Sequence, residues 1–106
     1  TRARIGDDEI SVIVCGNDLI AIGVMRALHD IGRSVPEQMS VVGFDDIPWA
    51  SYSIPGLATV RQPFGALGQE AAKLLIRRMD GDEAPQIGLK LDMRLVPRGS
   101  LRRLKD

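Results

Sequence analysis

The chain has 106 residues, and its 14 basic and 14 acidic side chains cancel to a net charge of zero. This length suffices for one compact domain, and the zero charge argues against direct binding of DNA or an anionic membrane, because phosphate binding needs a basic surface. No apolar run approaches the roughly 20 residues that would span a bilayer, and the single cysteine excludes a disulfide within the chain and favours a reduced, cytoplasmic setting.

The first part of the chain predicts a strand followed directly by a helix. Residues 11–15 form a β-branched run that is typical of a strand buried on both faces. Asn17 or Asp18 is a suitable N-cap for the following helix. Asp18 is interpreted as a cap and not as a ligand contact, and its charge also suits the positive end of the helix dipole. Gly32 is a suitable residue to end this helix.

The rest of the chain predicts three more strands and one long helix. A second buried strand is expected at residues 40–44, one helical turn at residues 47–51 and a third strand at residues 57–61. A helix with one apolar face is expected from Phe64, with Gly81 at its end. Strict alternation of apolar and polar residues at 89–95 predicts a strand with its odd positions buried and one wet face, at a sheet edge.

This order of elements predicts an α/β fold with a doubly wound parallel sheet. Two helices are too few to cover both faces of such a sheet, so the fold is expected to be incomplete, a fragment that another chain or more polypeptide completes. The polar tail at residues 99–106 is expected to be frayed.

Polar or aromatic side chains follow three of the predicted strands. Asn17 follows the first strand, Asp45 the second and Phe64 the third. Because ligands of open α/β sheets bind beyond the carboxyl ends of the strands, these residues are candidates for ligand contact. A carboxylate accepts several hydrogen bonds and an amide both donates and accepts, so the pair suits a hydroxyl-rich sugar or a heterocycle edge, with Phe64 as an apolar wall.

Each of these residues also has a simpler structural interpretation. Asn17 can cap the first helix as readily as it can bind a ligand. Asp45 can be a turn former, and Asp46 is interpreted as the cap of the short helical turn. Phe64 can be a core residue. His29 is expected to be a solvated helix residue and Cys15 an inert thiol in the core.

Catalytic motifs are scarce in this sequence. Dinucleotide-binding and phosphate-binding glycine loops, a nucleophile elbow and a cluster with metal-ligand spacing are all missing from the 106 residues. The acidic pair Asp45 and Asp46 can hold a divalent cation, but no lysine follows a predicted strand to complete such a site. We therefore predict that the chain is not an enzyme and has no catalytic residues, metal site or cofactor.

A run of motifs makes the chain resemble one known family. These motifs are "ND" before a helix, "VP" before "SVVGFDD", then "PGLATVRQP" and "GQEAAKLL". Together they cover nearly the whole chain and resemble the C-terminal part of the lactose-repressor/galactose-repressor (LacI/GalR) family of bacterial transcription regulators.

The resemblance implies a periplasmic-binding-protein-like effector domain with two subdomains. Residues 1–62 would belong to the C-terminal subdomain, residues 63–88 to the N-terminal subdomain, and residues 89–106 would form a returning edge strand and tail. The positions that match the effector cleft of the family are Asn17, Asp45 and Phe64 again. The positions that resemble its dimer surface are Ile22, Met25, Arg26, Tyr52, Ser53, Ile54 and Pro55.

The implied function is regulation of transcription by a small effector. The partners would be a sugar or purine-like effector, a second copy in a homodimer or exchanged oligomer, and operator DNA through an N-terminal headpiece that this chain does not contain. Membrane is not an expected partner. The alternative is a periplasmic-type sugar-binding protein of a transport system, which shares the fold.

Overall fold

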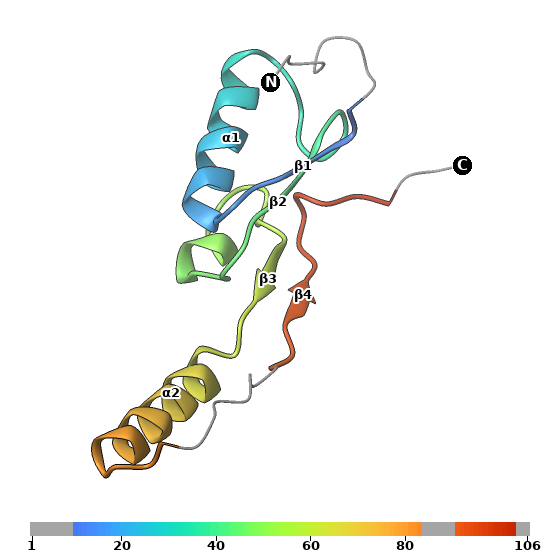
Figure 1. Cartoon of the computed structure of the whole chain (residues 1–106). Helices are drawn as coiled ribbons and strands as arrows, with labels where there is room; N and C mark the ends of the chain where they lie inside the picture. The colour runs from blue at the N-terminus through green and yellow to red at the C-terminus, as the bar shows by residue number, and fades with distance from the viewer. Residues whose placement is uncertain (1–9, 84–90, 104–106) are drawn as a thin grey trace. The chain divides into compact units, whose positions relative to one another are not determined.

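The computed structural model describes residues 10–83 and 91–103. The described chain divides into two compact units: residues 10–61 with 94–103 form the first, and residues 62–83 with 91–93 the second. The elements in chain order (Figure 1) are β1 (Val12–Val14), α1 (Asp18–Asp30), β2 (Ser40–Val42), the 3-10 helix η2 (Pro48–Ser51), β3 (Thr59–Arg61), α2 (Phe64–Met79) and β4 (Arg94–Val96).

Parallel strands organise the first unit. β1 pairs with β2 in parallel, with Val12 opposite Ser40 and Val14 opposite Val42. The segment from Ala58 continues the parallel arrangement on the other side of β2, through a bridge between Val42 and Ala58. β3 then pairs antiparallel with β4, which returns along it. The expected α/β architecture with parallel strands and a returning edge strand is present.

The predicted end of α1 at Gly32 is confirmed, and of the two candidate N-caps the structure selects Asn17. The Asn17 side chain accepts a hydrogen bond from the Ile20 amide at 2.8 Å, so Asn17 is the N-cap. Ile31 is the C-cap of the helix, and Gly32 follows it. Gly32 has a φ of +78°, in the left-handed conformation that glycine adopts without strain. The end of α2 at Met79 is followed in the same way by Gly81, at φ +92°.

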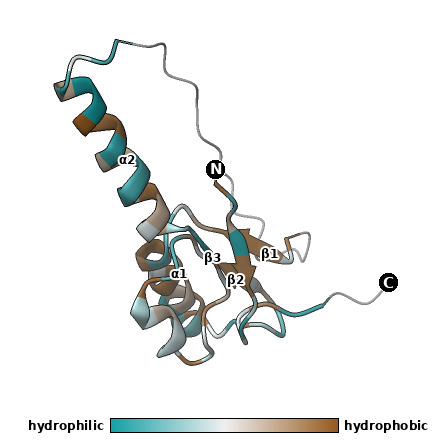
Figure 2. Ribbon diagram, turned by 90° about the horizontal axis from the view of Figure 1, so that it is seen from below, coloured by the Kyte–Doolittle hydropathy of each residue, from teal (hydrophilic) through white to brown (hydrophobic). Residues whose placement is uncertain are grey.

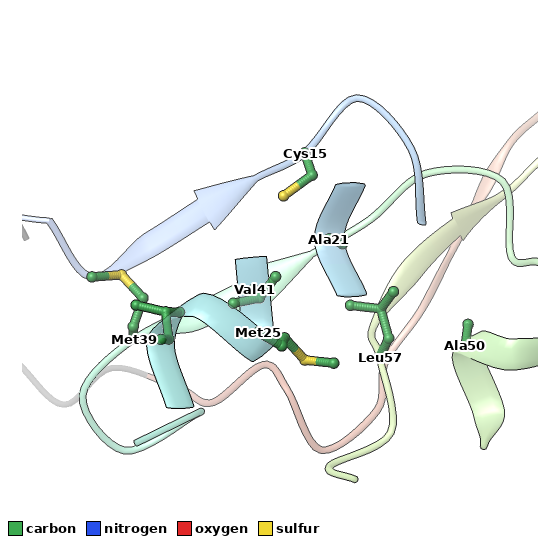
Figure 3. Close-up of a cluster of buried hydrophobic side chains, with 8 residues drawn as sticks. Cys15, Ala21, Met25, Met39, Val41, Ala50 and Leu57 are labelled. Carbon is green, nitrogen blue, oxygen red and sulfur yellow. The ribbon is translucent and has the colours of Figure 1, made fainter. Parts of the chain in front are cut away.

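The core of the first unit lies between α1, β2 and the segment around η2. Figure 3 shows side chains from these elements converging, and Ala21, Val41, Ala50 and Leu57 are fully buried. The whole cluster of buried side chains comprises Cys15, Ala21, Met25, Leu28, Met39, Val41, Ala50 and Leu57. Burial raises the pKa of the Cys15 thiol, as suits the expected core residue.

The prediction that β1 is buried on both faces is wrong. Ile13 packs against the core, but Val12 is 43% exposed and Val14 73% exposed. Both strands are strongly apolar, as the brown colour of β1 and β2 in Figure 2 shows. The described elements cover one face of β1 only, so the other face keeps the apolar residues of a buried strand without the layer that would bury them.

The prediction of a frayed tail is also wrong for residues 99–103; residues 104–106 lie outside the described residues. Ser100 is fully buried, and its hydroxyl donates to the Val41 carbonyl at 2.6 Å and accepts from the Ala58 amide at 2.8 Å. Its backbone bonds to Gly56 and Val41. The polar composition of this segment predicted exposure to solvent. Instead, the Ser100 hydroxyl supplies hydrogen-bond partners for backbone groups of Val41 in β2 and of Ala58 in the neighbouring segment.

The last strand is shorter than predicted, and its burial pattern differs. β4 covers Arg94–Val96, and Leu91–Met93 before it are not in a strand; Leu89 lies outside the described residues. Met93 and Leu95, expected to be buried, are about half exposed because the described elements place no second layer over them. No residue of the long helix α2 is buried, and most of its apolar positions are exposed.

We expect Ser100→Ala to lower the free energy of unfolding by about 1–3 kcal/mol, because the buried Val41 carbonyl and Ala58 amide each lose a partner. Ser51→Ala, which removes an exposed hydroxyl on η2, is the matched control and should change stability by less than about 0.5 kcal/mol. Urea unfolding of the two variants measures the difference. Equal, small losses would show that the Ser100 bonds do not hold the segment.

Candidate functional site

The carboxyl ends of β1 and β2 lie side by side. The amide of Asp18 donates to the carbonyl of Phe44 at 3.0 Å, which joins the segment after β1 to the segment after β2. Asn17 precedes one partner of this bond and Asp45 follows the other, and both are half-buried. The structure thus brings the two predicted polar residues to the same edge of the parallel pair.

One end of the Asn17 side chain caps helix α1, and the other end takes no part in the cap. Its Oδ1 is the helix cap and accepts from the Ile20 amide. The amide nitrogen of the same side chain carries two donors that the cap does not use. The cap is therefore shown, and ligand contact through the nitrogen stays a prediction.

Asp45 occupies an unusual backbone conformation. Its φ of +117° lies in the region that favours glycine, and Asp46 follows with φ +58°. The Asp45 amide donates to the Val60 carbonyl at 2.9 Å, which ties this turn to the neighbouring parallel segment. Such strained conformations persist only where surrounding contacts determine them, and they cluster at binding sites.

The prediction that Asp18 is the N-cap is wrong. Asp18 is the first residue of α1 and is fully buried. Its carboxylate accepts from the Ile47 amide at 2.8 Å and from the Thr59 hydroxyl at 2.5 Å. The Thr59 oxygen in turn accepts from the Asp46 amide at 3.2 Å. Asp18 thus organises the turn that contains Asp45, a role that no local signal in the sequence indicates.

Gly43 lies against this buried carboxylate. A Cβ at this position would collide with the Asp18 side chain and lie 3.1 Å from a methyl carbon of Leu57. The glycine of the "GFDD" motif is therefore required by close approach, because any side chain would displace the carboxylate or the core.

The prediction that Asp46 caps η2 is also wrong. The N-cap of η2 is Ile47, without a side-chain hydrogen bond, and the Asp46 carboxylate instead pairs with Arg61 at 2.6 Å and Arg98 at 2.9 Å. Burial alone would raise the pKa of Asp46, but hydrogen bonds and charge from Arg61 and Arg98 outweigh it and lower the pKa. The two arginines are distant in sequence, so spacing gives no hint of this arrangement.

Phe64 belongs to the other unit of the chain. It is the first residue of α2 and its side chain is 55% exposed. Its contribution to a ligand wall remains a prediction from the sequence and the family resemblance.

The predicted dimer residues of α1 and of the loop after η2 line a common open hollow. Its lining residues are Ile22, Met25, Arg26, His29, Ser53 and Ile54, and Pro55 lines an adjoining hollow with Met25 and Ile54. Ile54 is 97% exposed and Tyr52 is 74% exposed. This exposed apolar surface has the character of an interface, and His29 is exposed as expected.

Residues 10–83 and 91–103 contain no group of three or more histidine, cysteine, aspartate or glutamate side chains that could hold a metal ion. None of the helices in this part of the chain combines the length and the apolar character needed to cross a bilayer.

Residues 7–101 match the model of the periplasmic binding protein-like domain family, and the chain belongs to this family. Its relatives include HTH-type transcriptional regulators of Streptomyces coelicolor and Escherichia coli and the ribose operon repressor of Escherichia coli, which confirms the resemblance to the LacI/GalR family. The chain is 42% identical to the HTH-type transcriptional regulator MalR of Streptomyces coelicolor over 98 residues. This match covers 92% of the chain but 28% of MalR, so the chain spans less than a third of such relatives.

Two solved structures show the same fold at substantial identity. A LacI family transcriptional regulator from Enterococcus faecium with bound ribose gives a TM-score of 0.78 at 37% identity, over 90% of this chain and 35% of that one. The lac repressor dimer bound to operator and an anti-inducer gives 0.76 at 36% identity, over 85% of this chain and 31% of that one. The predicted fold class, an incomplete α/β fold of the periplasmic-binding-protein-like type, is confirmed.

The lowered pKa of Asp46 predicts a definite pH dependence of stability. The carboxylate stabilises the fold fully above its ordinary pKa of 3.8 and loses this effect as pH falls through the lower folded-state value. We expect Asp46→Asn to cost about 1.5–3 kcal/mol of unfolding free energy above about pH 5, and progressively less below it. Urea unfolding from pH 3 to 7 measures this, and a cost that is independent of pH would contradict the pairing.

Proposed function

We propose that this chain is the effector-binding and dimerisation part of a bacterial DNA-binding transcription regulator, with a sugar or purine-like molecule as effector. One observation carries the proposal: Asn17 and Asp45 flank the hydrogen bond that joins the ends of two parallel strands. This is where open α/β sheets bind ligands.

The chemistry of these two side chains suits a polyhydroxylated molecule. The Asp45 carboxylate accepts hydrogen bonds from adjacent hydroxyls, and the free amide nitrogen of Asn17 donates to a ring or hydroxyl oxygen. Phe64 supplies an apolar face for the ring. The structure of the Enterococcus faecium regulator with bound ribose supports a sugar as the effector class.

The proposed domain organisation follows the family. Residues 1–62 belong to the C-terminal subdomain, residues 63–88 to the N-terminal subdomain, and residues 89–106 return to the first. The two compact units of the described chain meet at residues 61–62 and 93–94. The first of these boundaries lies within one residue of the proposed boundary at 62–63 and supports it. The second lies a few residues after the proposed boundary at 88–89.

The other partners are proposed from the same relatives. The lac repressor structure is a dimer bound to operator, and MalR is an HTH-type regulator. These relatives support operator binding by the complete protein through a helix-turn-helix headpiece. A cytoplasmic location is proposed because operator DNA lies there. With no net charge, this segment would bind the effector and not DNA. The relatives favour this function over transport, and over catalysis, since they are regulators.

A second copy of the chain is the proposed partner of the surface formed by α1 and the loop after η2. The residues assigned to this dimer surface are Ile22, Met25, Arg26, Tyr52, Ser53, Ile54 and Pro55. Two observations support this assignment: most of these residues line the same hollow, and Ile54 within it is 97% exposed.

We expect Asp45→Asn to abolish the response to effector while operator binding persists. The variant keeps the shape of the side chain and removes the charge, which costs about 1.5–3 kcal/mol in each charge-assisted bond, or roughly 10- to 150-fold in affinity. Asp30→Asn, which removes an exposed carboxylate on α1, is the control. Calorimetric titration with a panel of sugars that includes ribose and cellobiose, together with an operator-release assay, measures both effects. Unchanged affinity in Asp45→Asn would refute the assignment.

Asn17 needs a variant that separates its two roles. Asn17→Ser keeps an oxygen that can cap α1 but removes the amide nitrogen. We expect this variant to remain folded, with its melting temperature within a few degrees of the parent, and to lose about tenfold or more in effector affinity. Normal affinity in a folded Asn17→Ser protein would leave Asn17 as a helix cap alone.

We expect Ile54→Asp to weaken the dimer without unfolding the subunit, because the side chain is almost fully exposed in the single chain. Ile31→Asp, at an exposed apolar position after α1, is the matched control. Sedimentation over a range of concentrations should show monomer for the first variant and dimer for the second. A dimer in both would place the interface elsewhere, for example on the exposed helix α2.

A further inference from the structure

A charged cluster lies immediately next to the proposed effector contact Asp45. It consists of Asp46, Arg61 and Arg98, here called the Asp46 triad. The two oxygens of Asp46 are divided between the arginines: Oδ2 accepts from Arg61, whose Nε and Nη2 lie at 2.7 Å and 2.6 Å, and Oδ1 pairs with Arg98 at 2.9 Å. The carboxylate is only 6% exposed, so both of its oxygens are held in one geometry.

The two arginines come from the two segments that join the units of the chain. Arg61 is the last residue of β3, directly before the second unit begins at Gln62. Arg98 follows β4, on which the chain returns to the first unit at Arg94. Arg98 also donates to the Leu57 carbonyl at 2.9 Å, which anchors it in the segment before β3. Asp46 is therefore bonded to both connecting segments at once.

The turn that the triad holds is strained at two consecutive residues. Asp45 and Asp46 both have positive φ, and a non-glycine residue at φ +117° is costly unless its surroundings determine it. The amides of the turn donate to the strand that carries Arg61: the Asp45 amide to the Val60 carbonyl and the Asp46 amide to the Thr59 hydroxyl. Side-chain and backbone bonds thus fix the turn from one side.

We propose that Asp46 is a positioning residue: paired with Arg61 and Arg98, it holds Asp45 in its strained conformation and couples that conformation to both connecting segments. The inference rests on the proposed role of Asp45 as an effector contact. A movement of either connecting segment would be transmitted to Asp45 through these bonds.

The test compares amide hydrogen exchange in the full-length protein carrying one of four substitutions. Asp46→Asn and Arg98→Gln break the triad, Arg98→Lys keeps a positive charge, and Asp30→Asn is the control on the exposed surface of α1. The readout is exchange of the Asp45 amide, which bonds to Val60, relative to amides within α1. A titration with ribose and cellobiose accompanies each variant.

We expect the Asp45 amide to exchange about tenfold faster in Asp46→Asn and Arg98→Gln, with α1 unchanged, because loss of a charge-assisted bond promotes local opening. Arg98→Lys should recover part of the protection, and Asp30→Asn should match the parent. No change at Asp45, or equal acceleration throughout α1, would overturn the positioning role.

The titrations separate this inference from the proposed function. If the Asp45 amide opens selectively and sugar affinity falls with it, both stand. If it opens selectively while a sugar binds normally, Asp45 is positioned but is not an effector contact, and the assignment of Asp45 in the proposed function fails. If no sugar binds to the parent protein, the proposed sugar effector fails, while the exchange data still decide whether the triad holds the turn.

Discussion

The buried carboxylate of Asp18 is the interaction on which this arrangement depends. It is fully buried at the first position of α1, and it joins three segments: the helix itself, the loop at Ile47 and the strand that begins at Thr59. A buried carboxylate is tolerated only when its oxygens are satisfied, and here a backbone amide, a hydroxyl and the positive end of a helix satisfy them. The ends of the parallel strands are therefore fixed relative to one another before any ligand is present.

The polar groups around Asp18 form an ordered chain that leads to the candidate site. Asp18 bonds to Thr59, Thr59 accepts from the Asp46 amide, and Asp46 pairs with Arg61 and Arg98. The small size of Gly43 allows the backbone to pass against the carboxylate. Networks of this kind are costly when incomplete, so their members constrain one another. The residues of the short motif "GFDD" have different roles. Gly43 allows close packing against Asp18, Asp45 is the proposed effector contact, and Asp46 is the proposed positioning residue.

The sequence predicted well those features that depend on neighbouring residues. The boundaries of α1 and α2 followed from Asn17, Gly32 and Gly81, because capping and left-handed glycine conformations are local. The position of Asn17 and Asp45 at one edge followed from the strand order and from the family resemblance. Features that depend on distant residues were missed. Asp18 and Asp46 were assigned to local caps, but their partners are tens of residues away, and the polar tail gave no sign that Ser100 is buried in the first unit. The exposure of Val14 was missed for a related reason, since the sequence of a strand reports the environment of the complete fold, and the described elements supply only part of that environment.

The most direct test of this account is a double-mutant cycle between Asp18 and Thr59, using Asp18→Asn, Thr59→Val and the two together, with unfolding free energies measured in urea. The account predicts that the two changes are strongly non-additive, with a coupling energy of about 1–3 kcal/mol, because each substitution removes the same buried hydrogen bond. It also predicts that each single variant loosens the turn at Asp45. Additive effects, within about 0.5 kcal/mol, would contradict the claim that this buried carboxylate fixes the strand ends.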